Sequence, residues 1–149
     1  MDQWYEPLWT VDRTALADLL DAPTRVMTCG PGFDPEDQDR LLDLFLRRDE
    51  EIMRYAIMLE DRLAGTFEFS HRLQRTVVGF CTHRDLRGRG IIRRAWQDLG
   101  RDHAGPEGYA AFRWLHNMPA ARVLTAMGFQ EDRVVMGHEH PVVCCSLKR

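Results

Sequence analysis

The chain has 149 residues, of which 44% are hydrophobic and 29% charged, and its formal net charge is −3 at pH 7. This length suits one domain in which folding buries roughly 70% of the accessible surface of the chain. No apolar run approaches the ~20 residues that cross a bilayer, and a net acidic chain has no general attraction for nucleic acid or anionic membranes. We therefore expect a single domain over residues 1–149 that binds neither nucleic acid nor membranes.

The first residues and the cysteines bear on the cellular compartment. The segment MDQWYEPLWT carries Asp2 and Glu6 and lacks a basic start followed by an apolar stretch, so it does not resemble a secretory signal. The cysteines show no CxxC spacing and are Cys29, Cys81, Cys144 and Cys145. We expect reduced, buried thiols and a cytoplasmic protein.

The first third of the chain predicts two helices. An apolar start near Leu8–Val11 precedes TALADLLD, which has helical spacing and ends before Pro23. Thr24–Gly32 reads as extended, with a turn at Gly30, Pro31 and Gly32. In DPEDQDRLLDLFLRRDE, Asp34 can cap a helix whose first position suits Pro35. Its apolar stripe is Leu41, Leu42, Phe45 and Leu46.

The middle of the chain changes to strand periodicity. Met53–Glu60 and Leu63–Ser70 read as strands around a turn at Asp61–Arg62, and Thr76–Thr82 reads as a third strand. Gly79 interrupts the third strand, which suggests a bulge or a close backbone approach. The second strand places Thr66, Glu68 and Ser70 on one face and Phe67 and Phe69 on the other.

The last third alternates helices and strands. A helix from about Ile91 to His103 should turn Ile92, Ala95, Trp96 and Leu99 inward. The remaining predicted elements are a strand at Tyr109–Leu115, a helix at Pro119–Met127 ended by Gly128, and two strands, Val134–Met136 and Pro141–Leu147, around Gly137–His138. This order predicts an α/β or α+β fold with helices on both faces of one sheet.

The stretch DLRGRGII joins the third strand to the following helix. A backbone bent at Gly88 and Gly90 leaves N–H groups unpaired at the positive end of the helix dipole, and such a place binds anions. Local positive charge comes from Arg84, Arg87, Arg89, Arg93 and Arg94. We expect a small anionic ligand here, and the alternative is a solvated surface turn.

The chain resembles the GNAT superfamily of acetyl-CoA-dependent N-acetyltransferases, above all over residues 50–147. The family signature R/Q-x-x-G-x-G/A ends the fourth strand and wraps the pyrophosphate of coenzyme A. It is matched here from Arg87 to Gly90, with Ile92 in place of the last small residue. The second family motif, N-x-x-A before an aliphatic stretch and Gly-Phe, is matched by Asn117, Ala120, Val123, Gly128 and Phe129.

The resemblance implies a single GNAT-like domain, with a mixed, mostly antiparallel central sheet flanked by helices on both faces, and acetyl-CoA as acyl donor. It implies that main-chain groups of Phe80, Cys81 and Thr82 pair with the pantetheine arm, which Asn117 also contacts beside Ala120. The residues implied to hold the pyrophosphate are Arg87, Gly88, Arg89, Gly90, Ile91 and Ile92.

A second position, after Ile92, also departs from the family pattern. Four residues before Gly128 the family usually has a tyrosine that acts as general acid on the departing thiolate, and here Leu124 stands in its place. With the spacing from Asn117 to Gly128, this leucine also resembles the GNAT-like internal virion proteins of short-tailed phages. Two readings stay open: an enzyme, alone or as a homodimer, that acetylates a small-molecule or peptide amine, and a non-catalytic phage virion component with virion partners.

Acetyl transfer by direct attack of an amine requires a base. Glu68 is the first candidate, because it lies on the strand beside the cofactor strand, and its alternative role is an exposed carboxylate on a polar face. His71 and His83 are further candidates. Direct attack needs no thiol nucleophile, so we expect Cys81 to be packed. His138 and His140 lack further ligands nearby, and we expect no metal site.

Overall fold

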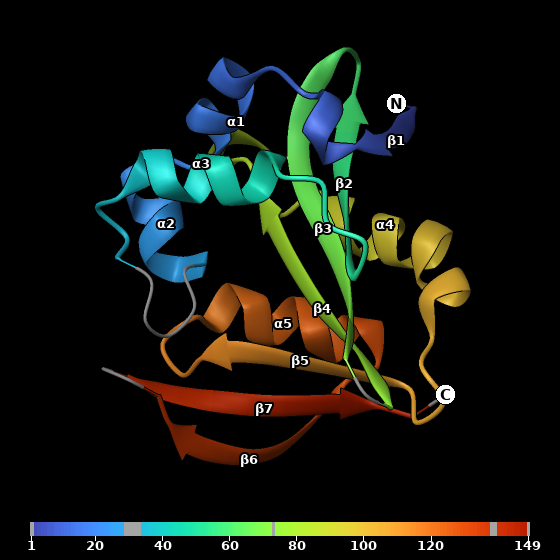
Figure 1. Cartoon of the computed structure of the whole chain (residues 1–149). Helices are drawn as coiled ribbons and strands as arrows, with labels where there is room; N and C mark the ends of the chain where they lie inside the picture. Colours follow the sequence, from blue (N-terminus) through green and yellow to red (C-terminus); the bar gives the residue numbers. More distant parts are fainter. Residues whose placement is uncertain (1, 29–33, 73, 138–139, 149) are drawn as a thin grey trace.

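The computed structural model describes residues 2–28, 34–72, 74–137 and 140–148. Seven strands form one sheet in the order β1-β2-β3-β4-β5-β7-β6. Every pair of neighbours is antiparallel except β4 and β5, which are parallel. Helices cover both faces of this sheet (Figure 1), so the predicted fold class is confirmed.

The strands are β1 (Gln3–Pro7), β2 (Ile52–Leu59), β3 (Arg62–Arg72), β4 (Arg75–Thr82), β5 (Tyr109–Trp114), β6 (Gln130–Met136) and β7 (Pro141–Leu147). The α-helices are α1 (Arg13–Leu19), α2 (Ala22–Thr28), α3 (Gln38–Leu46), α4 (Ile91–Leu99) and α5 (Met118–Met127). Short 3-10 turns occur at Leu8–Thr10, Arg84–Leu86 and Gly100–His103.

Each face of the sheet has its own hydrophobic core. The larger core packs α4 and α5 against the face that carries Phe67 and Phe69, both fully buried. The smaller core packs α1 and α3 against the face that carries Ala56 and Cys81. The predicted alternation along β3 is therefore correct, because its two phenylalanines share one face and Glu68 faces the other way.

The predicted extended conformation of Thr24–Gly32 is wrong over the part that the structure describes. Residues Ala22–Thr28 form helix α2, and residues 29–32, with the expected glycine turn, lie outside the described residues. Asp21 accepts a hydrogen bond from the Thr24 N–H at 3.0 Å, and Pro23 occupies the first turn, where its missing N–H costs nothing. The proline therefore begins a new helix as well as following the previous one.

Smaller differences concern element ends. The helix expected from Asp34 begins later, because the side chain of Asp37 caps it by accepting from the Arg40 N–H. The hairpin turn lies at Glu60 and Asp61, both at positive φ, and not at Asp61–Arg62. The helix from Ile91 ends at Leu99 and continues as a 3-10 turn. Strand β6 begins four residues earlier than predicted, at Gln130, and β1 was not predicted.

Gly79 forms no bulge. The pairing of β3 with β4 is continuous through Gly79, which lies opposite Glu68. The other prediction for this glycine, a close approach, is correct, because a Cβ there would lie 3.0 Å from the Cγ atom of Glu68.

Candidate functional site

The parallel strands β4 and β5 diverge along their length. They pair only at Thr76↔Tyr109, Val77↔Ala110 and Val78↔Ala111. Beyond Val78, β4 stays paired with β3 and β5 stays paired with β7. Figure 1 shows the two strands meeting at the right of the view and spreading toward α2 at the left. This end of the sheet borders two cavities, of about 490 and 130 Å³.

The larger cavity gathers most of the predicted cofactor residues. Its walls include Phe80, Cys81, Thr82, Arg87, Gly88, Ile92, Asn117 and Ala120. The remaining three predicted residues, Arg89, Gly90 and Ile91, belong to the same turn and helix start but do not border the cavity. Motifs that lie 30 residues apart in the sequence are thus brought to one cavity by the divergence of two neighbouring strands.

The glycine turn has the backbone conformation that its sequence predicts. Gly88 and Gly90 have φ values of 78° and 72°, in the left-handed region, and Gly90 is the N-cap of α4. A Cβ at either glycine would meet no atom within 4 Å among the described residues, so the space above the turn is open. The first N–H groups of any helix have no partner within that helix, and they suit an anion that approaches this turn.

Ile92 fills the position where the family signature has a small residue. Its side chain is buried in the larger core with Ile91 and Ala95. The side chain is therefore turned into the protein, which leaves the main chain of this helix start to face a ligand.

Arg87 and Asn117 both contact helix α2. The Nη2 atom of Arg87 donates to Thr24 Oγ1 at 2.8 Å, and the amide of Asn117 donates to the Met27 carbonyl at 3.3 Å. Asn117 also caps α5, because its Oδ1 accepts from the Ala120 N–H. Helix α2 also lines the larger cavity, through Thr24, Met27 and Thr28. None of these three was predicted from the sequence as a site residue. The sequence signal for this helix is Asp21, which can cap a helix N-terminus, followed by Pro23, which suits a first helical turn.

Glu68 lies beside the cavities and does not line them. Its Oε2 atom accepts from Arg54 Nε at 2.9 Å, and 34% of its side chain is exposed. Gly79, over which the Glu68 side chain lies, does line the smaller cavity. The structure therefore places this candidate base at the edge of the site.

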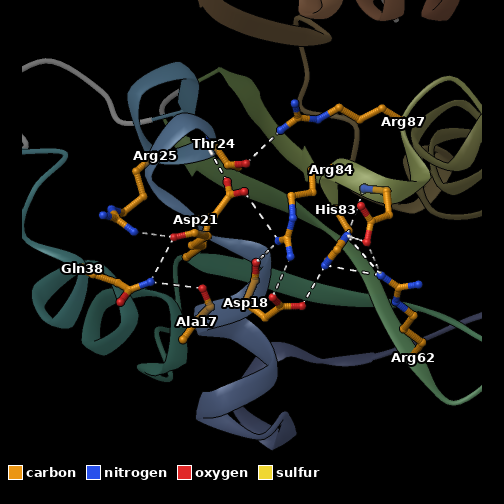
Figure 2. Close-up of polar contacts among 12 residues, drawn as sticks. Ala17, Asp18, Asp21, Thr24, Arg25, Gln38, Arg62, His83, Arg84 and Arg87 are labelled. Carbon is orange, nitrogen blue, oxygen red and sulfur yellow. Dashed lines mark hydrogen bonds and ion pairs between the residues drawn. The ribbon is translucent and has the colours of Figure 1, made fainter.

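His83 serves a different purpose from the one predicted. Its side chain is only 2% exposed, its Nδ1 accepts from the Asp85 N–H, and its Nε2 lies 2.9 Å from Asp18 Oδ2. Figure 2 shows it within a polar network that also holds Arg84 and Asp21. The hydrogen bond from His83, followed by that from Arg84, lowers the pKa of Asp18. Both ring nitrogens of His83 are hydrogen-bonded, so His83 links α1 to the end of β4. It lines neither cavity.

His71 lies at the wrong end of β4 for catalysis between the diverging strands. It pairs with Thr76, near the start of β4, and its ring stacks on His103 with centroids 5.7 Å apart. Thr82, which lines the larger cavity at the other end of β4, is six residues away, or roughly 20 Å along a strand. The smaller cavity begins nearer, at Val78, but His71 lines neither cavity.

Cys81 is a packed thiol. It is buried in the smaller core, and burial raises its pKa to about 12, so the thiol is neutral at pH 7. Cys144 and Cys145 are also free thiols, half-buried and buried, and Cys29 lies outside the described residues.

Neither a metal-binding cluster nor a membrane-spanning helix occurs within the described ranges. No group of three or more His, Cys, Asp or Glu residues there could hold a metal ion, and His138 of the HEH segment falls outside those ranges. None of the helices described is long and apolar enough to cross a membrane.

Comparison with known proteins agrees with this geometry. A model of the acetyltransferase (GNAT) family matches residues 13–129. No curated protein sequence matches the chain.

Solved structures share the fold at low sequence identity. The structure of AAC(6')-Ib with ribostamycin and coenzyme A is 14% identical with a TM-score of 0.78, covering 100% of this chain and 94% of that one. The microcin C7 self immunity acetyltransferase MccE, in complex with acetyl-CoA and AMP, is 15% identical with a TM-score of 0.72, covering 96% and 89%. The ribosomal-protein-S18-alanine N-acetyltransferase from Escherichia coli is 12% identical with a TM-score of 0.69, covering 99% and 94%.

Proposed function

The chain belongs to the acetyltransferase (GNAT) family, and we propose that it is an N-acetyltransferase that takes the acetyl group from acetyl-CoA and transfers it to an amine by direct attack in a ternary complex. We further propose that residues 1–149 act as one acyl-CoA-binding domain. The amine and the thioester would meet between β4 and β5, where rate is gained by holding the two reactants together.

One observation carries this proposal: the strands diverge at the cavity that the glycine turn borders. Beyond Val78 one edge of β4 has no strand partner in the described chain, so a pantetheine arm can pair with Phe80–Thr82 as an additional strand does. The turn from Arg87 to Ile92 would hold the pyrophosphate through main-chain N–H groups at the start of α4. A strand N–H beside the thioester would donate to its carbonyl oxygen and stabilise the negative charge that develops there when the amine attacks.

For the acceptor, we propose a small amine with an apolar or aromatic body. The smaller cavity is lined by Met27, Phe112, Trp114 and Val142, and Phe112 is 56% exposed. No carboxylate of the described chain lines either cavity, so a polycation would lack charge partners there. A turnover assay with arylalkylamines, polyamines and ribostamycin tests this proposal, and faster turnover of the polycations would contradict it.

The alternative is a non-catalytic GNAT fold, for example a phage virion component with virion partners. Leu124 favours it, since this buried side chain lines the smaller cavity without a hydroxyl that protonates a leaving thiolate. Acetyl-CoA binding without turnover of any peptide, polyamine or arylalkylamine would support this alternative.

We predict that Gly90→Val abolishes acetyl-CoA binding in isothermal titration calorimetry. Valine disfavours the left-handed backbone at this N-cap, and the distorted turn would misplace the N–H groups that face the pyrophosphate. Gly128→Val is the matched control, because Gly128 also has a positive φ, of 97°, but ends α5 on the side away from Asn117. Unchanged affinity in Gly90→Val would contradict the site assignment, as would equal losses in both variants.

A further inference from the structure

The carboxylate of Glu68 is held from one side by a buried arginine. Arg54 lies opposite Glu68 on β2, and its Nε donates to Glu68 Oε2 at 2.9 Å. The Arg54 side chain is 7% exposed and lies over the Phe45 ring of α3, 5.6 Å from the ring centroid. An arginine packed in this way has little freedom to move, so it fixes the direction of the carboxylate that it binds.

The other oxygen of the same carboxylate lies over a residue without a side chain. A Cβ built on Gly79 would be 3.1 Å from Glu68 Oε1 and 3.3 Å from its Cδ. These contacts are tighter than side chains ordinarily make, so any other residue at position 79 would displace the carboxylate. Glycine at this position is therefore explained by the carboxylate, since β3 and β4 pair here without a bulge.

Gly79 is also the place where the sheet opens. The last β4–β5 pair is Val78↔Ala111, so Gly79 is the first residue of β4 beyond it, and Gly79 lines the smaller cavity. Phe112, the next residue of β5, lines the same cavity from the other strand. The oxygen of Glu68 that is not bound to Arg54 thus lies at the point where the two strands part.

We propose that Arg54 and Gly79 are positioning residues that hold the Glu68 carboxylate at the opening of the sheet, where it takes the proton of the acceptor amine. This inference rests on the proposed function. The Glu68 oxygen accepts a proton from the amine nitrogen, that nitrogen bonds to the acetyl carbon, and the carbon–sulfur bond breaks with its electron pair leaving on sulfur. Arg54 keeps one oxygen occupied, and Gly79 leaves room for the other.

The first test observes the carboxylate without any turnover. The ¹³C NMR signal of the Glu68 carboxyl carbon, assigned by its absence in Glu68→Gln, is compared between the wild-type protein and two variants of β4. Gly79→Ala should shift this signal because the new methyl group displaces the carboxylate. Val77→Ala, on the same face of β4 two residues earlier, should leave it in place. A signal unmoved by Gly79→Ala would overturn the proposal.

The second test measures the consequence for the reaction. Glu68→Gln should lower kcat by about 10²-fold or more, as loss of a positioned base does. Gly79→Ala should also lower kcat, but by less than the roughly 10²-fold that a misplacement of about 1 Å costs, because the added methyl group displaces the carboxylate by only a few tenths of an ångström. In the Glu68→Gln background Gly79→Ala should have no further effect, because both changes act through one carboxylate. Additive losses would show that Gly79 acts in another way and would overturn its assigned role.

A third comparison separates positioning from folding. Arg54→Lys keeps the charge but loses the planar donor, so kcat should fall while the Kd of acetyl-CoA stays within about twofold. Formate or acetate added to Glu68→Ala should restore part of the lost rate, which a structural role does not predict. Unchanged turnover in Glu68→Gln overturns this inference alone. Absence of both acetyl-CoA binding and turnover in the wild-type protein overturns the proposed function, while the NMR comparison still decides the placement of Glu68.

Discussion

At the scale of single residues, Leu124 stands where the resemblance to the family leads us to expect a tyrosine. The side chain is 3% exposed, belongs to the larger core and lines the smaller cavity. None of the described residues that line the two cavities is an Asp, Glu, His or Tyr. No lining carboxyl, imidazole or phenol there can protonate the departing sulfur, so we expect transfer to be slow.

We predict that Leu124→Tyr raises kcat by about tenfold, since a tyrosine hydroxyl can supply that proton. The adjoining cavity of about 130 Å³ gives the larger ring room without strong overpacking. Leu124→Phe is the control, because it adds the ring but no hydroxyl. Equal gains in both variants, measured as steady-state turnover with a saturating amine, would mean that volume and not the hydroxyl matters.

At the scale of elements, α2 is fixed to the remainder of the site by polar contacts. Figure 2 shows Arg87 of the glycine turn donating to Thr24, and Arg84 3.5 Å from Asp21 at the start of the helix. Asn117, the N-cap of α5, donates to the Met27 carbonyl. A hydrogen bond from Thr24 lowers the pKa of Asp21. The wall that α2 contributes to the larger cavity is thus joined to both cofactor motifs.

We predict that Thr24→Val lowers the free energy of unfolding by about 1–2 kcal/mol, because the buried hydroxyl is the acceptor for a charged donor. Thr28→Val, one turn later, should change it by less than about 0.5 kcal/mol, since only a bond within the helix is lost. Urea unfolding measures both values. Equal effects of the two variants would show that the contact with Arg87 does not hold the helix.

The elements also show what the sequence could not reveal. The periodicity of β2 to β5 and of α4 and α5 predicted those elements within a few residues, because each buries a regular face. Strand β1 escaped detection because it is short, lies at the sheet edge and owes its conformation to pairing with β2, a contact distant in sequence. Thr24–Gly32 was predicted as extended, whereas Ala22–Thr28 forms helix α2, in whose first turn the Thr24 N–H donates to Asp21.

The candidate site was predictable to a similar degree. The two motifs predicted to bind the cofactor depend on glycine and asparagine, whose backbone roles are local, and most of the predicted residues line one cavity. Roles that depend on distant partners were not predictable: His83 is occupied by Asp18, which lies 65 residues earlier, and Arg54 becomes relevant only through its register with Glu68.

At the scale of the whole molecule, the contacts of Asp18 make the docking of α1 depend on pH. Its pKa in the folded protein is lowered by hydrogen bonds from His83 and then Arg84. A lowered pKa stabilises the fold at pH values above about 3.9, the value for an unfolded chain, and this contribution disappears as the pH falls through the lower folded value. Acid should therefore loosen the docking of α1.

We predict that Asp18→Asn destabilises the protein at pH 6 and has a much smaller effect at pH 3, as measured by urea unfolding at both values. Asp2→Asn, at the exposed start of the chain, is the control and should change stability little at either pH. A loss of stability in Asp18→Asn that stays constant from pH 6 to pH 3 would show that the carboxylate charge is not what holds α1.

Because β4 and β5 meet at only three residue pairs, binding of the proposed donor acetyl-CoA between them would stabilise the folded protein. A donor molecule seated between the strands binds the native state and not the unfolded chain, and at a hundred times its Kd it adds about 2.7 kcal/mol to stability. When acetyl-CoA is scarce, a larger fraction of molecules would be open between β4 and β5, and open molecules are cleaved by cellular proteases. The amount of enzyme would then follow the supply of acetyl groups without any separate regulator.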